Sequence, residues 1–131
     1  MSNETARSPH TLNWFEIPVT DMDRAVALYS AVIDGPLKLE LFGGVPNAVF
    51  PRHADGAVTG ALICDPKRPP VRGGGTTIYL NVPGGVAPAL GRAREAGATV
   101  VLPVTDIGPF GTIALIADRD GNVVGLHTPK A

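Results

Sequence analysis

The fold is decided by residues 15–29, FEIPVTDMDRAVALY, where an alternating segment leads directly into a helical one. Every second residue at its start is apolar, which is the pattern of a strand with one buried face. This apolar row consists of Phe15, Ile17 and Val19. Thr20 or Asp21 then offers a helix N-cap, and apolar residues recur at helical spacing from Met22 onward. The stretch therefore predicts a strand followed at once by an amphipathic helix.

The same order of elements occurs twice along the chain. The first half predicts a helix at 22–33 and strands at 12–19, 37–41, 47–50 and 58–64. The second half predicts a helix that begins at 86 and ends at Gly97, and strands at 76–82, 99–102, 112–117 and 123–127. Trp14 and Thr77 occupy equivalent places in the two halves. A period near half the chain length predicts two similar modules packed together.

The length of 131 residues leaves room for one domain with one substantial core. The segment DPKRPPVRGGG, residues 65–75, is rich in proline and glycine and is predicted to be a linker. We expect a first module at about 12–64 and a second at about 76–128, which together form a single α+β domain over 12–131. Residues 1–11 are predicted to be a disordered tail, because they are polar and lack the apolar core of a secretory signal.

Composition and charge exclude several classes of function. Eleven basic and twelve acidic residues give a formal net charge of −1. The chain shows no cluster of lysine and arginine, so nucleic acid is not an expected partner. No apolar run has the length of a membrane helix, so a membrane is not an expected partner either. The single cysteine, Cys64, precludes an internal disulfide and predicts a cytoplasmic protein.

Two polar residues are candidates for chemistry because of the strand faces they occupy. Glu16 lies opposite the apolar row of its strand and is predicted to face away from the helix. His127 is in register with Gly125 on the last predicted strand, while Val124 and Leu126 take the other face. If the two sheets share one concave surface, both side chains line it. The alternatives are a solvated carboxylate on an open sheet face and a histidine bonded to the backbone.

Four stretches of the chain resemble the vicinal oxygen chelate superfamily: FEIPVTDMDRAVALY, GATVVLP, TDIGPFGTIALIADRDGN and VVGLH. This superfamily contains lactoylglutathione lyases, extradiol dioxygenases, fosfomycin-resistance transferases and bleomycin-binding proteins. The resemblance covers residues 12–128 and is closest to glyoxalase-like proteins of unassigned activity. It implies two βαβββ modules whose sheets form an incomplete barrel around a cavity.

The resemblance also implies where a metal would bind in this fold. Metal-using members place a ligand on the first and last strand of each module, and three of these positions fall on Trp14, Thr77 and Gly125. The strand of the fourth ligand, residues 58–64, contains no His, Asp or Glu. Trp and Gly side chains do not coordinate divalent ions, and a Thr hydroxyl is a poor ligand. The sequence therefore predicts no metal and no cofactor.

We expect a metal-free cavity that binds or sequesters a small organic molecule, as bleomycin-resistance proteins do. Its predicted lining is Trp14, Glu16, Thr77, Tyr79, Gly125 and His127. One alternative is a metal-free acid–base enzyme, a lyase or isomerase in which Glu16 and His127 are catalytic. A weaker alternative is a metal-dependent lyase or dioxygenase with relocated ligands. Because superfamily members often pair, sometimes with the cavity at the interface, a homodimer is expected.

Overall fold

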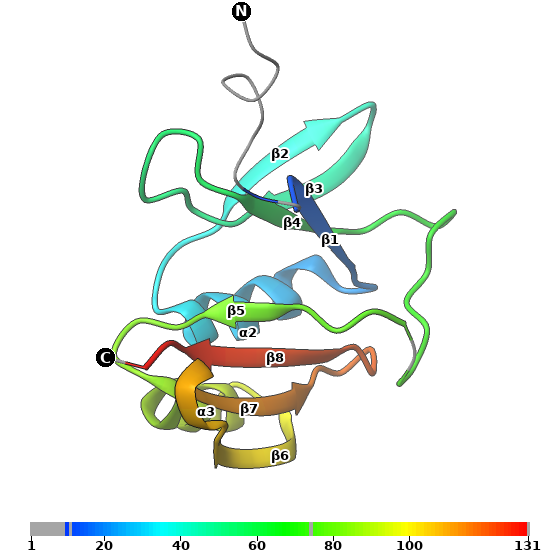
Figure 1. Ribbon diagram of the computed structural model, residues 1–131. Coiled ribbons are helices and arrows are strands. Elements are labelled where there is room, and N and C mark those ends of the chain that lie inside the picture. Colours follow the sequence, from blue (N-terminus) through cyan, green and yellow to red (C-terminus); the bar gives the residue numbers. More distant parts are fainter. Residues whose placement is uncertain (1–9, 11, 74, 131) are drawn as a thin grey trace, which may run out of the picture.

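A computed structural model describes residues 10, 12–73 and 75–130 of the chain. The element order is the same in its two halves (Figure 1). The first half contains β1 (Trp14–Pro18), α2 (Met22–Ile33), β2 (Lys38–Phe42), β3 (Val45–Val49) and β4 (Thr59–Ile63). The second contains β5 (Tyr79–Asn81), α3 (Val86–Glu95), β6 (Thr99–Asp106), the 3-10 helix η1 (Gly108–Phe110), β7 (Thr112–Ala117) and β8 (Val123–Thr128). The two βαβββ modules predicted from the repeat are thereby confirmed.

Each module folds into one four-stranded mixed sheet with the same strand order. The first sheet is ordered β1-β4-β3-β2 and the second β5-β8-β7-β6. The first strand of each module pairs in parallel with the last, as in the register of Glu16 with Ala61 and of Tyr79 with Gly125. The remaining neighbours are antiparallel. A chain that repeats its pattern therefore repeats its topology, and the α+β fold is confirmed.

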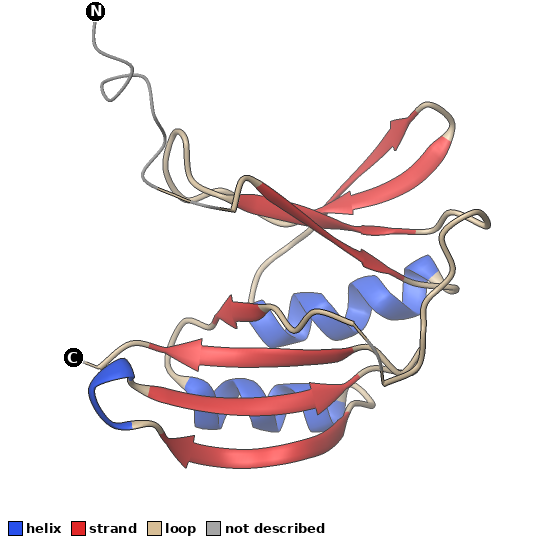
Figure 2. Ribbon diagram, turned by 45° about the vertical axis from the view of Figure 1, so that its right-hand side comes forward, coloured by secondary structure: helices blue, strands red, loops and turns tan. Residues whose placement is uncertain are grey.

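The two helices pack against each other and each covers its own sheet (Figure 2). Helix α2 begins where the Asp21 carboxylate accepts a hydrogen bond from the Arg24 backbone N–H at 3.0 Å. It ends at Asp34, which adopts a left-handed conformation just before Gly35 and Pro36. Helix α3 tolerates Pro88 because that residue lies in the first turn. Neither helix has the length and hydropathy of a transmembrane span.

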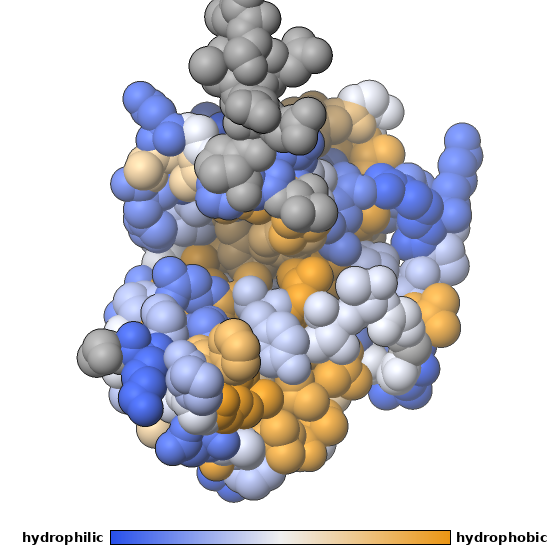
Figure 3. Space-filling view, in the orientation of Figure 1, coloured by the Kyte–Doolittle hydropathy of each residue, from blue (hydrophilic) through white to orange (hydrophobic). Residues whose placement is uncertain are grey.

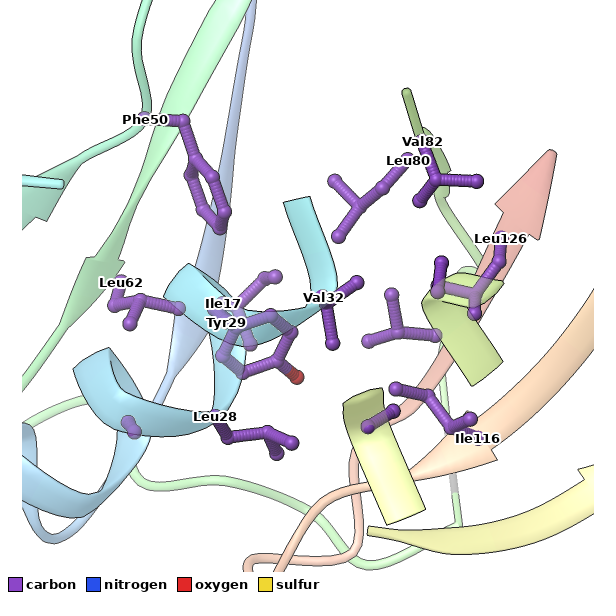
Figure 4. Close-up of a cluster of buried hydrophobic side chains, with 14 of the residues drawn as sticks. Ile17, Leu28, Tyr29, Val32, Phe50, Leu62, Leu80, Val82, Ile116 and Leu126 are labelled. Carbon is purple, nitrogen blue, oxygen red and sulfur yellow. The ribbon is translucent and has the colours of Figure 1, made fainter. Parts of the chain in front are cut away.

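One continuous core joins the two modules (Figure 4). From the first module it takes the apolar row of β1, with Ile17 and Val19 buried and Phe15 packed against them. Tyr29 and Val32 of α2 are fully buried at its centre. From the second module Val124 and Leu126 of β8 point into it. The predicted faces of the first and last strands are therefore confirmed, and Glu16 and His127 lie on the opposite sides.

The turn between β7 and β8, residues 118–122, fastens the second module to the first. The buried Asp118 carboxylate accepts hydrogen bonds from the Tyr29 hydroxyl at 2.8 Å and from the Asn122 side-chain amide at 2.8 Å. Asn122 also donates to the Pro18 carbonyl oxygen, and the Thr20 hydroxyl donates to Asp120. Burial, reinforced by the Asp118 charge, raises the pKa of Tyr29 well above its ordinary value. The segment is therefore a hairpin turn between two antiparallel strands whose polar side chains hold the modules together.

Several strands differ in extent from those expected. The strand expected at 76–82 forms only over Tyr79–Asn81, although Ile78 and Val82 on either side still share backbone hydrogen bonds with β8. The strand expected at 99–102 continues through Pro103 to Asp106. It is the edge strand of its sheet, and its register with β7 is irregular on both sides of Leu102. The sheet therefore tolerates a proline there, although proline has no backbone N–H to donate. The strand expected at 47–50 forms at Val45–Val49. The tail expected at 1–11 lies almost wholly outside the described residues.

Candidate functional site

A cavity of about 460 Å³ lies where the two modules meet the linker. We call it the inter-module cavity. Strand β1, the linker, the approach to β5 and the start of β8 contribute its walls. Its lining residues are Glu16, Ile17, Pro18, Pro69, Val71, Gly75, Thr76, Ile78, Asn122, Val123 and Val124. Its volume falls within the range of about 300–1,000 Å³ that is common for small-molecule sites.

The walls of the inter-module cavity are largely aliphatic, with few polar groups. Valine, isoleucine and proline side chains dominate, and the Asn122 amide is already bonded to Pro18 and Asp118. Among the described lining residues, Glu16 is the one that carries a charge. A site of this composition favours an apolar molecule oriented by a small number of polar contacts.

Glu16 is held by a neighbour on its own strand and by a residue of the linker. Trp14, two positions earlier on the same face of β1, directs its indole N–H toward Glu16 Oε2 at 3.4 Å. Arg68 forms an ion pair with Glu16 Oε1, and its Nε donates to Asp65 at 3.4 Å. The hydrogen bond that Arg68 donates to Glu16, followed by the charge of Glu16, raises the pKa of Arg68. The Glu16 side chain is 31% exposed, so a ligand can reach it.

His127 lies at the other end of β8 from the inter-module cavity. The cavity touches β8 at Val123 and Val124, and His127 is four residues beyond Val123, about 13 Å along the strand. Its Nε2 lies 2.7 Å from the Phe110 carbonyl oxygen, which only accepts, so this nitrogen donates. The structure thus joins Glu16 to Trp14 and to the linker, and joins His127 to the backbone of η1.

Three of the other predicted lining residues, Thr77, Tyr79 and Gly125, belong to the second module, whereas Trp14 lies on β1 of the first. Thr77 is exposed, and Tyr79 is 49% exposed. The Tyr79 ring lies so close to the backbone of Gly125 that a Cβ added to Gly125 would overlap the ring. None of Trp14, Thr77, Tyr79 and Gly125 is among the described residues that line the inter-module cavity. Of the six predicted lining residues, Glu16 is therefore the one that the cavity includes.

The residues at the superfamily's metal positions do not fit a divalent ion. Trp14 and Thr77 offer no strong ligand, and the space beside Gly125 is filled by the Tyr79 ring. Strand β4 is buried throughout and carries no His, Asp or Glu. In the described part of the chain, no group of three or more His, Cys, Asp or Glu residues has the geometry to hold a metal ion.

A second hollow of about 100 Å³ lies between the start of α2 and the β7–β8 turn. Asp21, Asp118 and Asp120 line it. Each of these carboxylates already accepts a hydrogen bond from the protein, from Arg24, Tyr29 and Thr20 respectively. The hollow is too small for a typical organic ligand, and its polar groups belong to the junction between the modules.

The sequence pattern of the Glyoxalase/Bleomycin resistance protein/Dioxygenase superfamily matches residues 11–126, nearly the whole chain. The chain belongs to this superfamily. A search of curated proteins found no match. Among solved structures, the chain is similar to a glyoxalase/bleomycin resistance protein from Streptomyces sp. CB03234, with 26% identity, a TM-score of 0.60, and coverage of 90% of this chain and 100% of that one.

Two further solved structures of the superfamily are similar to the chain. TnmS3, described as an antibiotic binding protein from Streptomyces sp. CB03234, is 26% identical with a TM-score of 0.60, over 95% of this chain and 99% of that one. A glyoxalase/bleomycin resistance protein from Albidiferax ferrireducens T118 is 17% identical with a TM-score of 0.71, over 89% of this chain and 98% of that one. The latter likeness shows the fold alone.

Sequence reasoning missed the contribution of the linker to this glyoxalase-superfamily site. Pro69 and Val71 form part of the cavity wall, and Arg68 neutralises Glu16. A charged residue inside a proline-rich segment was the available signal, but Arg68 lies 52 residues from Glu16 along the chain. Nothing in the spacing of the two residues indicates that they meet.

Proposed function

We propose that this superfamily member binds a small, largely apolar organic molecule in the inter-module cavity and holds it unchanged, without a metal. The observation that carries the proposal is the cavity itself, with aliphatic walls and a single carboxylate among its described lining residues. The likeness to the antibiotic binding protein TnmS3 supports it. Trp14 supports the proposal by orienting Glu16, which supplies the polar anchor of the site.

The proposed binding is tested by titration calorimetry with 1-naphthalenemethanol, a neutral aromatic probe. We expect one probe per chain, because the cavity is a single aliphatic space. Thr76→Trp places a large ring at an exposed position in the cavity wall and is expected to abolish binding. Thr99→Trp, at an exposed position of β6 outside the wall, is the matched control and should leave binding intact. Equal binding by the Thr76→Trp variant contradicts the proposed site.

Sequestration and catalysis differ in what happens to the ligand. A panel of aromatic antibiotics incubated with the protein should be recovered unchanged, with protection that saturates at one molecule per chain. Conversion of any of them, checked by mass spectrometry, favours the acid–base alternative. That alternative needs a second titrating group beside Glu16, and His127 lies about 13 Å farther along β8 than the cavity wall.

We further propose that the chain forms a homodimer through its exposed apolar sheet surfaces. On the edge strand β2, Leu39 is 64% and Leu41 is 70% exposed, and in the second module Val101 of β6 is 50% and Phe110 of η1 is 73% exposed. Figure 3 shows hydrophobic residues gathered on the lower part of the molecule that faces the viewer. An exposed apolar edge strand readily pairs with another chain. We also propose Thr77, Tyr79, Gly125 and His127 as additional ligand contacts at such an interface, because Thr77 and Tyr79 are exposed.

Light scattering at micromolar concentration tests the dimer. We expect twice the chain mass of 13.5 kDa, and Leu41→Lys should shift the protein toward monomer because it places a charge on the exposed edge. Ala87→Lys adds the same charge at an exposed position of α3 and should leave the dimer intact. A wild-type protein that scatters as a monomer at this concentration contradicts the proposal.

A further inference from the structure

The charge balance at the inter-module cavity is unusual for a mostly aliphatic site. Glu16 lies in the wall, whereas the group that neutralises it does not: Arg68 belongs to the linker and is absent from the described lining residues. The Arg68 side chain is 54% exposed, so this ion pair faces solvent on one side. Exposed pairs of this kind are held weakly, and another cation can replace one of their members.

The two partners of this ion pair are anchored independently of each other. Glu16 keeps its orientation through the Trp14 indole N–H and its place in the paired strand β1. Arg68 keeps a second carboxylate partner, Asp65, whose side chain is 13% exposed. If Arg68 leaves Glu16, it therefore retains a partner, and the Glu16 carboxylate stays directed at the cavity without a counter-charge.

We propose that the inter-module cavity selects molecules in which a cationic nitrogen, an ammonium or a guanidinium group, is attached to an apolar body. This inference rests on the binding function proposed above and names the class of ligand. The cationic group takes the place of the Arg68 guanidinium on Glu16, while the aliphatic walls receive the apolar body. Arg68 is then an internal competitor, and its ion pair with Glu16 is the closed state of the site. Binding of the ligand releases Arg68 from Glu16, and Arg68 keeps its partner Asp65.

Calorimetry with three naphthalene probes tests the inference at neutral pH and low salt. The probes are 1-naphthylmethylamine, 1-naphthalenemethanol and 1-naphthoate, which share one ring system and differ in charge. We expect the amine to bind about tenfold more tightly than the alcohol, and the acid to bind more weakly than both, because Glu16 attracts the first and repels the last. Glu16→Gln should remove the preference for the amine, so that the amine and the alcohol bind this variant with about equal affinity.

Two arginine variants of the linker, one of them a control, test the role of Arg68. Arg68→Gln should raise the affinity for the amine about threefold to fivefold, because it removes the competitor, and should leave the affinity for the alcohol unchanged. Arg72→Gln removes another exposed linker arginine, which donates to the Arg119 carbonyl oxygen rather than to Glu16. It should change neither affinity. Circular dichroism melts of each variant report whether the fold is intact.

The three probes separate the preference for cations from the binding function itself. If the alcohol binds as tightly as the amine, the preference for cations is wrong and the proposed binding function stands. If Glu16→Gln removes the preference but Arg68→Gln leaves the amine unchanged, Arg68 is not a competitor. If none of the three probes binds, the inter-module cavity is not a ligand site, and both proposals fail together.

Discussion

Gly60→Ala is expected to lower the free energy of unfolding by about 3 kcal/mol, a large fraction of the stability of a domain of this size. Gly60 lies in β4, directly opposite Phe15 of the parallel strand β1. A Cβ at this position would overlap the Phe15 carbonyl oxygen and would lie 2.6 Å from the Phe15 ring, which is closer than van der Waals contact allows. Because the obstructing atom belongs to the backbone of a paired strand, β1 and β4 must separate to admit a methyl group. Chemical denaturation with urea measures the loss.

Two other glycines of the chain provide matched controls for this substitution. Gly125→Ala also meets an aromatic ring, but the Tyr79 side chain is half exposed and can rotate away, so we expect a loss of about 1 kcal/mol. Gly91 lies exposed within α3 with open space beside it, and alanine there should stabilise the protein by about 0.5–1 kcal/mol. Equal losses at Gly60 and Gly125 would contradict the role assigned to the Phe15 backbone.

Asp118→Ala is expected to lower the free energy of unfolding by about 3 kcal/mol through lost hydrogen bonds rather than crowding. The Asp118 side chain accepts bonds from the Tyr29 hydroxyl, the Asn122 side chain and the backbone N–H groups of Asp120 and Asn122. Alanine leaves the fully buried Tyr29 hydroxyl and the turn amides without an acceptor. Thermal denaturation should show a single transition at a lower temperature. An unchanged midpoint would contradict the fastening role of the turn.

Tyr29→Phe is the milder companion of this variant, and it adds a dependence on pH. It removes one donor while Asp118 keeps the others, so we expect a loss of about 1–2 kcal/mol near neutral pH. The folded protein holds the pKa of Tyr29 above that of an unfolded tyrosine, about 10. The stabilisation is therefore fully present below pH 10 and is lost as pH rises toward the folded pKa. The difference between wild type and variant should shrink above pH 10.

The fold was predictable because local patterns and tertiary packing agree in this chain. The alternation of Phe15, Ile17 and Val19 is typical of a strand with one buried face, and that face packs on the helix that follows. The repeat with Thr77 in place of Trp14 then predicted the second module. The extent of β6 was not predictable, because Pro103 ends a strand in most contexts and is tolerated only at an irregular edge. Edge position is a property of the assembled sheet.

The site was predictable only in part, because its residues meet through tertiary structure. Alternation correctly placed Glu16 opposite the core face of β1. It also placed His127 opposite the core face of β8, but it carries no information on how far apart two such residues lie along their strands. The linker was interpreted as a connection because its composition fits one, yet Val71 lines the cavity and Arg68 forms an ion pair with Glu16. A partner 52 residues away leaves no local pattern.

The hydrogen bonds between the β7–β8 turn and the first module cannot form until residues 118–122 have been synthesised. Thr20 and Asp120 are 100 residues apart, which at a translation rate of about 5–20 residues per second corresponds to about 5–20 s. Throughout that interval, the Tyr29 hydroxyl and the Pro18 carbonyl of the nascent chain lack the partners that residues 118–122 later supply. The first module therefore lacks these hydrogen bonds until the turn has been synthesised. Slower translation of the codons between 64 and 118 prolongs its exposure to chaperones and proteases.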